Sequence, residues 1–193
     1  MSTEASQSLR EGRSSIAFFC SQSCPGDVIL KAQDWANARE PESPPIIGGF
    51  HTPVDRDVLR ILLRGQAPVV IVLARSIEGW RAPKPLGAAI REAVAAGRAR
   101  ITSPFPATER RTTTDAALKR NRYILSLCHS VVFAHASPRG KTEQLAREAA
   151  ELGISLSTFP SKFNSNLSDL GAVDLTGRPR RMDGPGTAGI LPA

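Results

Sequence analysis

Short runs of apolar residues alternate along this chain with longer segments whose apolar residues recur at helical spacing. The runs predict strands at residues 16–19, 46–47, 68–73, 100–103 and 154–159, with one more just before residues 138–142. Helical spacing covers residues 28–39, 53–65, 86–96, the basic segment that starts near Thr112, and the segment from about residue 142 to Gly153. Residues 164–170 are expected to form a short closing helix.

Several helix ends can be placed from local chemistry. Thr52 is expected to cap a helix whose first residue is Pro53, and Gly65 to end it. Asp27 is expected to cap the first helix. The run at residues 68–73 shows no alternation, which indicates a strand covered on both faces, whereas the strand at 100–103 is expected near an edge.

Strands that alternate with helices predict an α/β fold with a doubly wound, mainly parallel sheet in a Rossmann-like three-layer α/β/α arrangement. Ligands of such folds bind beyond the carboxyl ends of the strands. The loops at residues 20–26, 48–52, 102–105 and 137–142 all follow predicted strands and should gather on that edge. We therefore treat the four loops as one candidate site.

Composition suits a single domain with a full core, because the chain has 193 residues of which 41% are hydrophobic. We assign this domain to residues 15–175. Residues 1–14 and the basic tail at 176–193 show no periodicity and are expected to be disordered. The tail contributes Arg178, Arg180 and Arg181 to the net charge.

The net charge of +7 favours a polyanionic partner such as nucleic acid. Aromatic residues make up only 5%, which argues against a broad platform for stacking bases. The polar N-terminus does not resemble a signal peptide, and the longest apolar run, at residues 67–74, is too short to span a bilayer. We expect a cytoplasmic protein without a membrane partner.

Three cysteines do not form the paired framework of a secreted protein. Cys20 and Cys24 could supply half of a metal site, but the sequence contains no second cysteine pair or close histidine pair to complete it. We therefore expect neither a metal nor another cofactor.

Two groups of residues suit an anionic ligand. Arg120 and Arg122, with Asn121 between them, lie on the basic helix and could make charge-assisted contacts to phosphate. In the turn at 138–142, Gly140 would offer a backbone amide at a helix N-terminus, beside the charge of Lys141 and the hydroxyl of Thr142. A solvated helix and an ordinary turn are the structural alternative, and Arg122 could instead hold a carbonyl or a carboxylate.

Two further loops add candidates. Gly48 and Gly49 precede a helix start, where backbone amides can bind an anion and His51 can donate a hydrogen bond. Ser21 lies in a loop of small residues that lets a ligand approach the backbone closely. Plain turns are the alternative at both places.

These motifs resemble, over about residues 15–160, the Rossmann-like domain of the DNA-processing protein A family (DprA, also called Smf) of the SLOG superfamily. The family's Arg-Asn-Arg helix motif, glycine loop, Ser-Pro-Phe-like segment and Gly-Lys-Thr turn are similar to Arg120-Asn121-Arg122, Gly48-Gly49-Phe50-His51, Ser103-Pro104-Phe105 and Gly140-Lys141-Thr142. The resemblance implies binding of single-stranded DNA, its transfer to a RecA-type recombinase, and a homodimer.

The chain departs from the family in three ways. Cys20-Ser21-Gln22 stands where the family usually reads Gly-Ser-Arg, and the fuller Gly-Ile-Asp…Ala-His stretch is missing. The length also leaves no room for the additional SAM-like and winged-helix domains of many members. A minimal, single-domain member of the family is therefore expected.

An enzyme is the alternative reading. The turn at 138–142 is also similar to the Pro-Gly-Gly-x-Gly-Thr-x-x-Glu turn of "lonely guy" nucleotide phosphoribohydrolases. However, Leu145 stands where their catalytic glutamate would be, and Glu143 comes too early to project in the same direction. A sensor of a nucleotide-derived signal, which needs no catalytic group, is a third reading. We expect a non-catalytic protein that binds single-stranded DNA or nucleotide phosphates.

Overall fold

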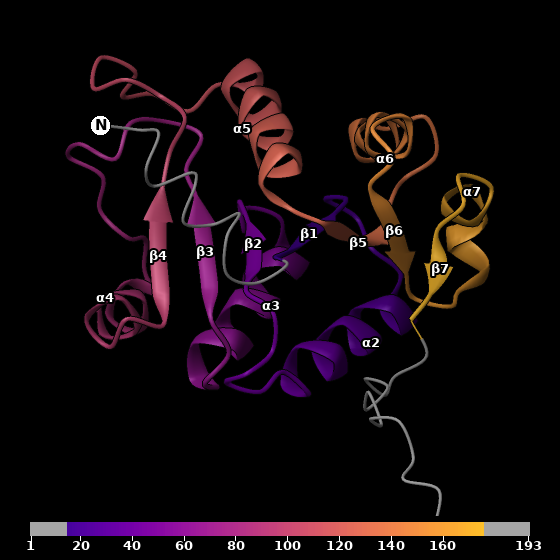
Figure 1. Cartoon of the computed structure of the whole chain (residues 1–193), viewed down its shortest axis with the longest axis horizontal. Coiled ribbons are helices and arrows are strands. Elements are labelled where there is room, and N and C mark those ends of the chain that lie inside the picture. Colours follow the sequence, from indigo (N-terminus) through magenta and orange to yellow (C-terminus); the bar gives the residue numbers. More distant parts are fainter. Residues whose placement is uncertain (1–14, 176–193) are drawn as a thin grey trace, which may run out of the picture.

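The computed structural model describes residues 15–175, and the disorder expected at 1–14 and 176–193 lies outside this range. The described chain forms one seven-stranded sheet in which every neighbouring pair is parallel (Figure 1). Its order is β4-β3-β2-β1-β5-β6-β7. The strands are β1 (Ile16–Cys20), β2 (Ile46–Gly48), β3 (Val69–Val72), β4 (Ala99–Thr102), β5 (Ser130–His135), β6 (Ser155–Thr158) and β7 (Val173–Asp174).

Helices connect these strands and cover both faces of the sheet. They are α2 (Gly26–Asn37), α3 (Pro53–Arg64), α4 (Gly87–Ala95), α5 (Thr114–Leu127), α6 (Lys141–Glu151), the 3-10 turn η1 (Lys162–Asn164) and α7 (Ser165–Ser168). The chain winds outward from β1 to β4, and α5 then carries it back to β5 beside β1. Because the winding direction reverses, α2, α3 and α4 lie on one face and α5, α6 and α7 on the other (Figure 1). The doubly wound three-layer fold is thus confirmed.

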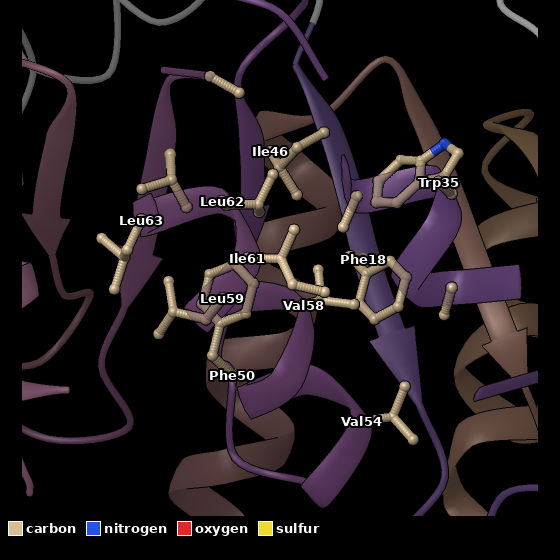
Figure 2. Close-up of a cluster of buried hydrophobic side chains, with 14 of the residues drawn as sticks. Phe18, Trp35, Ile46, Phe50, Val54, Val58, Leu59, Ile61, Leu62 and Leu63 are labelled. Carbon is tan, nitrogen blue, oxygen red and sulfur yellow. The ribbon is translucent and has the colours of Figure 1, made fainter. Parts of the chain in front are cut away.

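Each face of the sheet has its own hydrophobic core. Phe18 points into the core under α2 and α3, where its ring stacks on Trp35 with centroids 5.4 Å apart (Figure 2). The next residue, Phe19, points to the other face and stacks on Phe133 at 5.5 Å. Successive strand residues point to opposite faces, so an unbroken apolar run is what a doubly covered strand requires.

The helix ends test the local predictions. Thr52 caps α3 and forms a capping box with Asp55, Pro53 is the first residue, and Gly65 is the C-cap, as predicted. The prediction for Asp27 was wrong, because α2 begins at Gly26 after Pro25 and Asp27 lies inside its first turn. There the Asp27 carboxylate is bonded to the side chain of Ser161.

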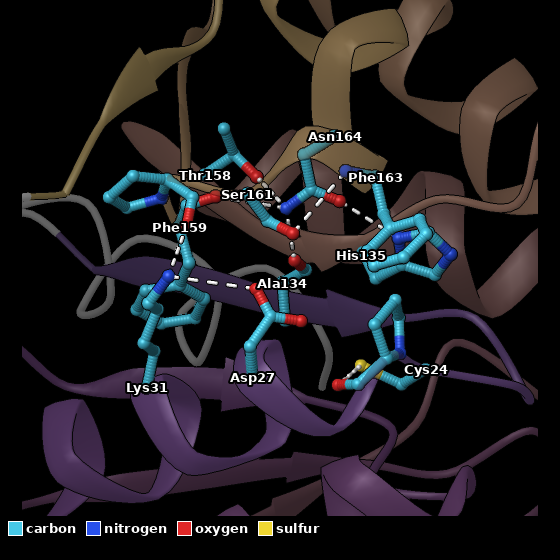
Figure 3. Close-up of polar contacts among 12 residues, drawn as sticks. Cys24, Asp27, Lys31, Ala134, His135, Thr158, Phe159, Ser161, Phe163 and Asn164 are labelled. Carbon is cyan, nitrogen blue, oxygen red and sulfur yellow. Dashed lines mark hydrogen bonds and ion pairs between the residues drawn. The ribbon is translucent and has the colours of Figure 1, made fainter.

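The strand β7 was not predicted, because two exposed residues give no periodic pattern. A buried polar network holds the chain that leads to it. The two hydrogens on Nδ2 of Asn164 are shared among three acceptors, the carbonyls of Ala134 and Phe159 at 2.9 and 3.0 Å and Thr158 Oγ1 at 2.9 Å (Figure 3). Its Oδ1 accepts from Nδ1 of His135 at 2.8 Å. Every polar atom of this buried amide is bonded, which fixes the turn after β6 against the carboxyl end of β5.

Within residues 15–175, the structure contains no helix that is both long and apolar enough to cross a membrane.

Candidate functional site

All strands are parallel, so the four loops identified from the sequence do lie on one edge of the sheet. Two of them are bonded to each other at the switch point between β1 and β5. The amide of Ser21 donates to the carbonyl of His135, and Ser21 Oγ accepts from the amide of Ser137, both at 2.9 Å. Ser21 is buried. Its hydroxyl therefore joins two loops and is not presented to solvent.

Arg120 lies on α5 but is directed into the protein, with only 3% of its surface exposed. Its guanidinium donates to the carbonyl of Val72 at 3.3 Å and to Nδ1 of His51 at 3.1 Å, while Nε donates to Oδ1 of Asn121 at 2.8 Å. Burial lowers the pKa of Arg120 to about 10, so the group stays charged at neutral pH. Because each of its three nitrogen atoms bonds to the protein, Arg120 positions the ends of β2 and β3 and is not an exposed cation.

The glycine loop after β2 is shaped by this arginine. A β-carbon on Gly49 would lie 1.8 Å from Nη1 of Arg120, and one on Gly48 would lie 3.0 Å from the Phe50 ring. Phe50 has a φ of 48°, a left-handed conformation that is uncommon for a bulky residue. The two glycines are therefore required for close packing of the loop against Arg120 and Phe50.

His51 is the exposed member of this cluster, with 52% of its side chain accessible. Partial burial and the positive charges of Arg120 and Arg56 lower the pKa of His51 to about 4. An arginine can only donate, so Nδ1 of His51 must be the acceptor and Nε2 must carry the proton. At neutral pH His51 thus offers an uncharged N–H donor at the carboxyl edge.

Asp55 lies beneath the same loop and is almost completely buried. Its Oδ2 accepts from the amide of Thr52 at 3.2 Å, whereas Oδ1 has no hydrogen-bond partner among the described residues. Burial raises the pKa of Asp55 to about 6, although its bonds to Thr52 and the charge of Arg120 act in the opposite direction. The buried carboxylate and the buried guanidinium thus compensate each other's charge.

Arg122 points away from Arg120, because residues two apart on a helix project about 200° apart. It forms a two-bond ion pair with Glu148 on α6, at 2.8 and 2.9 Å, and its side chain is 60% exposed. The hydrogen bonds that Arg122 donates to the Glu148 carboxylate raise the pKa of Arg122. The structure therefore separates the two arginines of the motif, and Arg122 holds a carboxylate, the alternative role that the sequence left open.

The turn at 138–142 is occupied by a side chain of its own helix. The buried Glu143 accepts from the amide of Arg139 and from the guanidinium of Arg147, and these bonds lower its pKa. A β-carbon on Gly140 would lie 2.9 Å from the carbonyl oxygen of Ser137, so the turn needs glycine here. The carboxylate supplies the negative charge that this helix N-terminus favours. Lys141 remains exposed beside it, and Thr142 is half-buried.

A cavity of about 420 Å³ opens at the carboxyl ends of β2 and β3, beside Arg120. The long connection between β3 and α4 forms one of its walls and contributes Arg75, Trp80 and Lys84. Sequence reasoning assigned no role to these residues. The length of this connection was the available indication, because long connections in compact domains are uncommon and often functional.

Within residues 15–175, no group of three histidine, cysteine or acidic side chains could hold a metal ion.

The fold and its edge loops define a Rossmann-like α/β protein. The sequence model of the DNA recombination-mediator protein A family matches residues 7–176. Because this match spans most of the chain, the protein belongs to that family. No curated protein matches its sequence.

Solved structures show the same fold. DNA processing protein A (DprA) from Streptococcus pneumoniae superposes with a TM-score of 0.70 at 19% identity, over 87% of this chain and 59% of that protein. The structure of DNA processing protein A from Helicobacter pylori is described for its single-stranded DNA binding mode. It superposes with a TM-score of 0.69 at 16% identity, over 86% of this chain and 77% of that protein. A molybdenum cofactor binding protein from Rippkaea orientalis superposes with a TM-score of 0.59 at 10% identity, over 86% of this chain and 91% of that protein. This chain thus spans about three fifths of the streptococcal protein.

Proposed function

We propose that this protein binds single-stranded DNA across the carboxyl edge of its sheet and acts as a mediator of recombination. Family membership is the observation that carries the proposal. The H. pylori protein, which has the same fold, is described as binding single-stranded DNA. DNA processing is therefore the activity that best matches both the family and the positive charge of this chain.

Exposed cations follow three of the four edge loops and would contact the phosphates. Arg56 lies near the start of α3, Lys119 lies on α5, and Arg139 and Lys141 flank the turn after β5. Phosphate contacts of this kind provide most of the affinity of sequence-independent binding and make it depend on salt. His51 would add a neutral hydrogen bond through Nε2–H.

Phe105 and Lys119 are a second feature that suits a DNA strand. Phe105 lies on the connection between β4 and α5, and Lys119 lies on α5. The Nζ atom of Lys119 lies over the Phe105 ring, 5.2 Å from its centroid. The Phe105 ring is buried, so it holds the ammonium group in place and does not stack on a base, whereas the exposed Lys119 can contact a phosphate. Arg120, Gly48 and Gly49 would act indirectly, by holding the loop that presents His51.

A RecA-type recombinase as partner and a homodimer as the assembly belong to the same proposal, as does a cytoplasmic location. A monomeric mass in light scattering across micromolar concentrations would contradict the homodimer. We do not propose a phosphoribohydrolase, because Glu143 is buried and bonded to Arg139 and Arg147, and Leu145 is buried.

Binding is tested by fluorescence anisotropy with a labelled oligothymidylate and a DNA duplex of the same length. We expect the single strand to bind more tightly than the duplex, because a flexible strand can follow loops on one edge of a sheet. Absence of binding to the single strand at low salt, by a folded full-length protein, would contradict the proposal.

A further inference from the structure

We propose that the cavity beside Arg120 is a binding site for a nucleoside monophosphate. The cavity lies between α3, α4, α5 and the connection at residues 73–86. It is displaced from the switch point between β1 and β5, where the loops containing Ser21 and Ser137 meet. The inference goes beyond the proposed function, because it concerns a small molecule and not a DNA strand.

The size of the cavity limits its occupant. Its volume of about 420 Å³ falls within the range of roughly 300–1,000 Å³ that is typical of small-molecule sites. Residues of α3, α4, α5 and the 73–86 connection line it, and a volume of this size suits a small molecule.

Part of the cavity lining suits a planar ring. The lining includes aliphatic side chains from the end of β3, from α3 and from the start of α4, together with Trp80 on the 73–86 connection. The aliphatic residues are Leu59, Ile71, Leu73, Leu86 and Ile90. Trp80 is half-buried and packs against the same core. An aromatic ring among aliphatic side chains is an environment in which a nucleobase ring packs well.

The basic residues of the lining suit a phosphate. Arg75 contributes a buried Nε that has no hydrogen-bond partner among the described residues. A buried donor without a partner costs free energy, and a phosphate oxygen would satisfy it with a charge-assisted bond. Arg56 and Lys84 line the same cavity and are exposed at its rim. Together they give the site a positive charge.

One acidic side chain, Asp57, also lines the cavity. Its carboxylate is already bonded to Arg60 at 2.8 Å. This local pair leaves Arg56, Arg75 and Lys84 as the cations that can receive an anion.

The connection that carries Arg75 and Trp80 is held in place by the segment between β4 and α5. Ser103 Oγ donates to the carbonyl of Arg75 at 2.6 Å, and the amide of Ser76 donates to the carbonyl of Glu109 at 2.6 Å. These bonds are made within the protein itself, so the fold holds this wall in position for a ligand.

The fluorescence of Trp80 provides a direct measure of ligand binding in the cavity. The sequence contains two tryptophans, so a Trp35→Phe variant leaves Trp80 as the single tryptophan. We would titrate this variant with AMP and, separately, with adenosine and with inorganic phosphate. The proposal predicts a saturable change of Trp80 fluorescence with AMP. AMP should bind at least about tenfold more tightly than adenosine alone or inorganic phosphate alone.

Variants then locate the ligand. Arg75→Met and Lys84→Ala should each weaken AMP binding severalfold, whereas Arg91→Ala, on the exposed side of α4, should not. Lys84 is exposed, so its substitution should leave the stability of the fold nearly unchanged. Absence of a fluorescence change up to roughly 10 mM AMP, or affinity that neither variant alters, would overturn the site.

Failure of this inference can be distinguished from failure of the proposed function. A protein that binds oligothymidylate but leaves Trp80 unaffected by AMP contradicts only the cavity site. A protein that responds to AMP but does not bind the oligonucleotide contradicts only the DNA-binding proposal.

Discussion

The guanidinium of Arg120 occupies the space beside Gly49 in which any other residue would place its β-carbon. That carbon would lie 1.8 Å from Nη1 and 2.1 Å from Cζ of Arg120. The arginine comes from α5 and the glycine from the loop after β2, so this contact joins two segments that are distant in sequence. It explains why the loop has glycine here although its φ does not lie in the left-handed region.

Gly49→Ala should destabilise the protein, because the added methyl group overlaps a buried, bonded guanidinium that cannot move without losing its partners. We expect a loss of about 1–3 kcal/mol in the free energy of unfolding, measured by guanidinium chloride denaturation. Gly26→Ala is the matched control, since a β-carbon at Gly26 meets nothing within 4 Å. Equal unfolding midpoints for the two variants would show that Arg120 moves freely.

Arg120→Met should be more damaging than Lys119→Met, its neighbour on α5. The first change removes the bonds to Val72 and His51 and leaves the Asp55 carboxylate buried without a compensating charge. Leaving a buried charge without its partner typically lowers the free energy of unfolding by about 3–5 kcal/mol. Lys119 is exposed, so Lys119→Met should lower it little. Similar thermal unfolding of both variants would contradict the structural role of Arg120.

Asp55→Asn tests the raised pKa of Asp55. The folded pKa of about 6 exceeds the ordinary value of 3.8, so the folded protein holds this proton more tightly than the unfolded chain. The contribution of Asp55 to stability is therefore largest below pH 3.8 and falls as the pH rises toward 6. The asparagine still accepts from Thr52 but does not titrate.

Relative to the unmodified protein, Asp55→Asn should gain roughly 1–3 kcal/mol between about pH 4 and pH 7. Denaturation curves measured at both pH values give this difference directly. A stability difference between the two proteins that does not change with pH would show that Asp55 ionises normally.

Arg122→Gln and Glu148→Gln should have matching, small effects. The pair is exposed, so each substitution should cost less than about 1 kcal/mol, and the double variant should cost less than the sum of the two. We also expect the affinity for oligothymidylate to stay unchanged in Arg122→Gln. A marked loss of affinity in that variant, with no change in Glu148→Gln, would show that Arg122 contacts phosphate.

The sequence was sufficient for the fold because the relevant patterns are local. The doubly buried run at β3 and the Thr52-Pro53 start of α3 each follow from neighbouring residues alone. Parallel strands then require their loops to share one edge. The two-residue β7 escaped prediction because its order depends on pairing with β6.

The candidate site was harder to predict from the sequence than the fold, because its chemistry depends on contacts between segments that are distant in the chain. Arg120 and Arg122 look equivalent in sequence, yet one is buried beneath Gly49 and the other is paired with Glu148. Likewise, the sequence shows a glycine and a lysine at the turn after β5. It does not show that the Glu143 carboxylate accepts a hydrogen bond from the backbone amide of Arg139 in this turn. The identity of site residues can be read from motifs, whereas their exposure requires the three-dimensional packing.

Binding to single-stranded DNA at the carboxyl edge is most directly tested by a salt titration with labelled oligothymidylate. We would compare the unmodified protein with Arg139→Ala/Lys141→Ala, and with Arg64→Ala/Arg91→Ala as a control of equal charge away from that edge. Our account predicts that only the first variant binds more weakly. Its plot of log affinity against log salt should be shallower by about 1.4, since each phosphate contact to a single strand contributes about 0.7. Identical affinities and slopes for all three proteins would contradict a DNA-binding carboxyl edge.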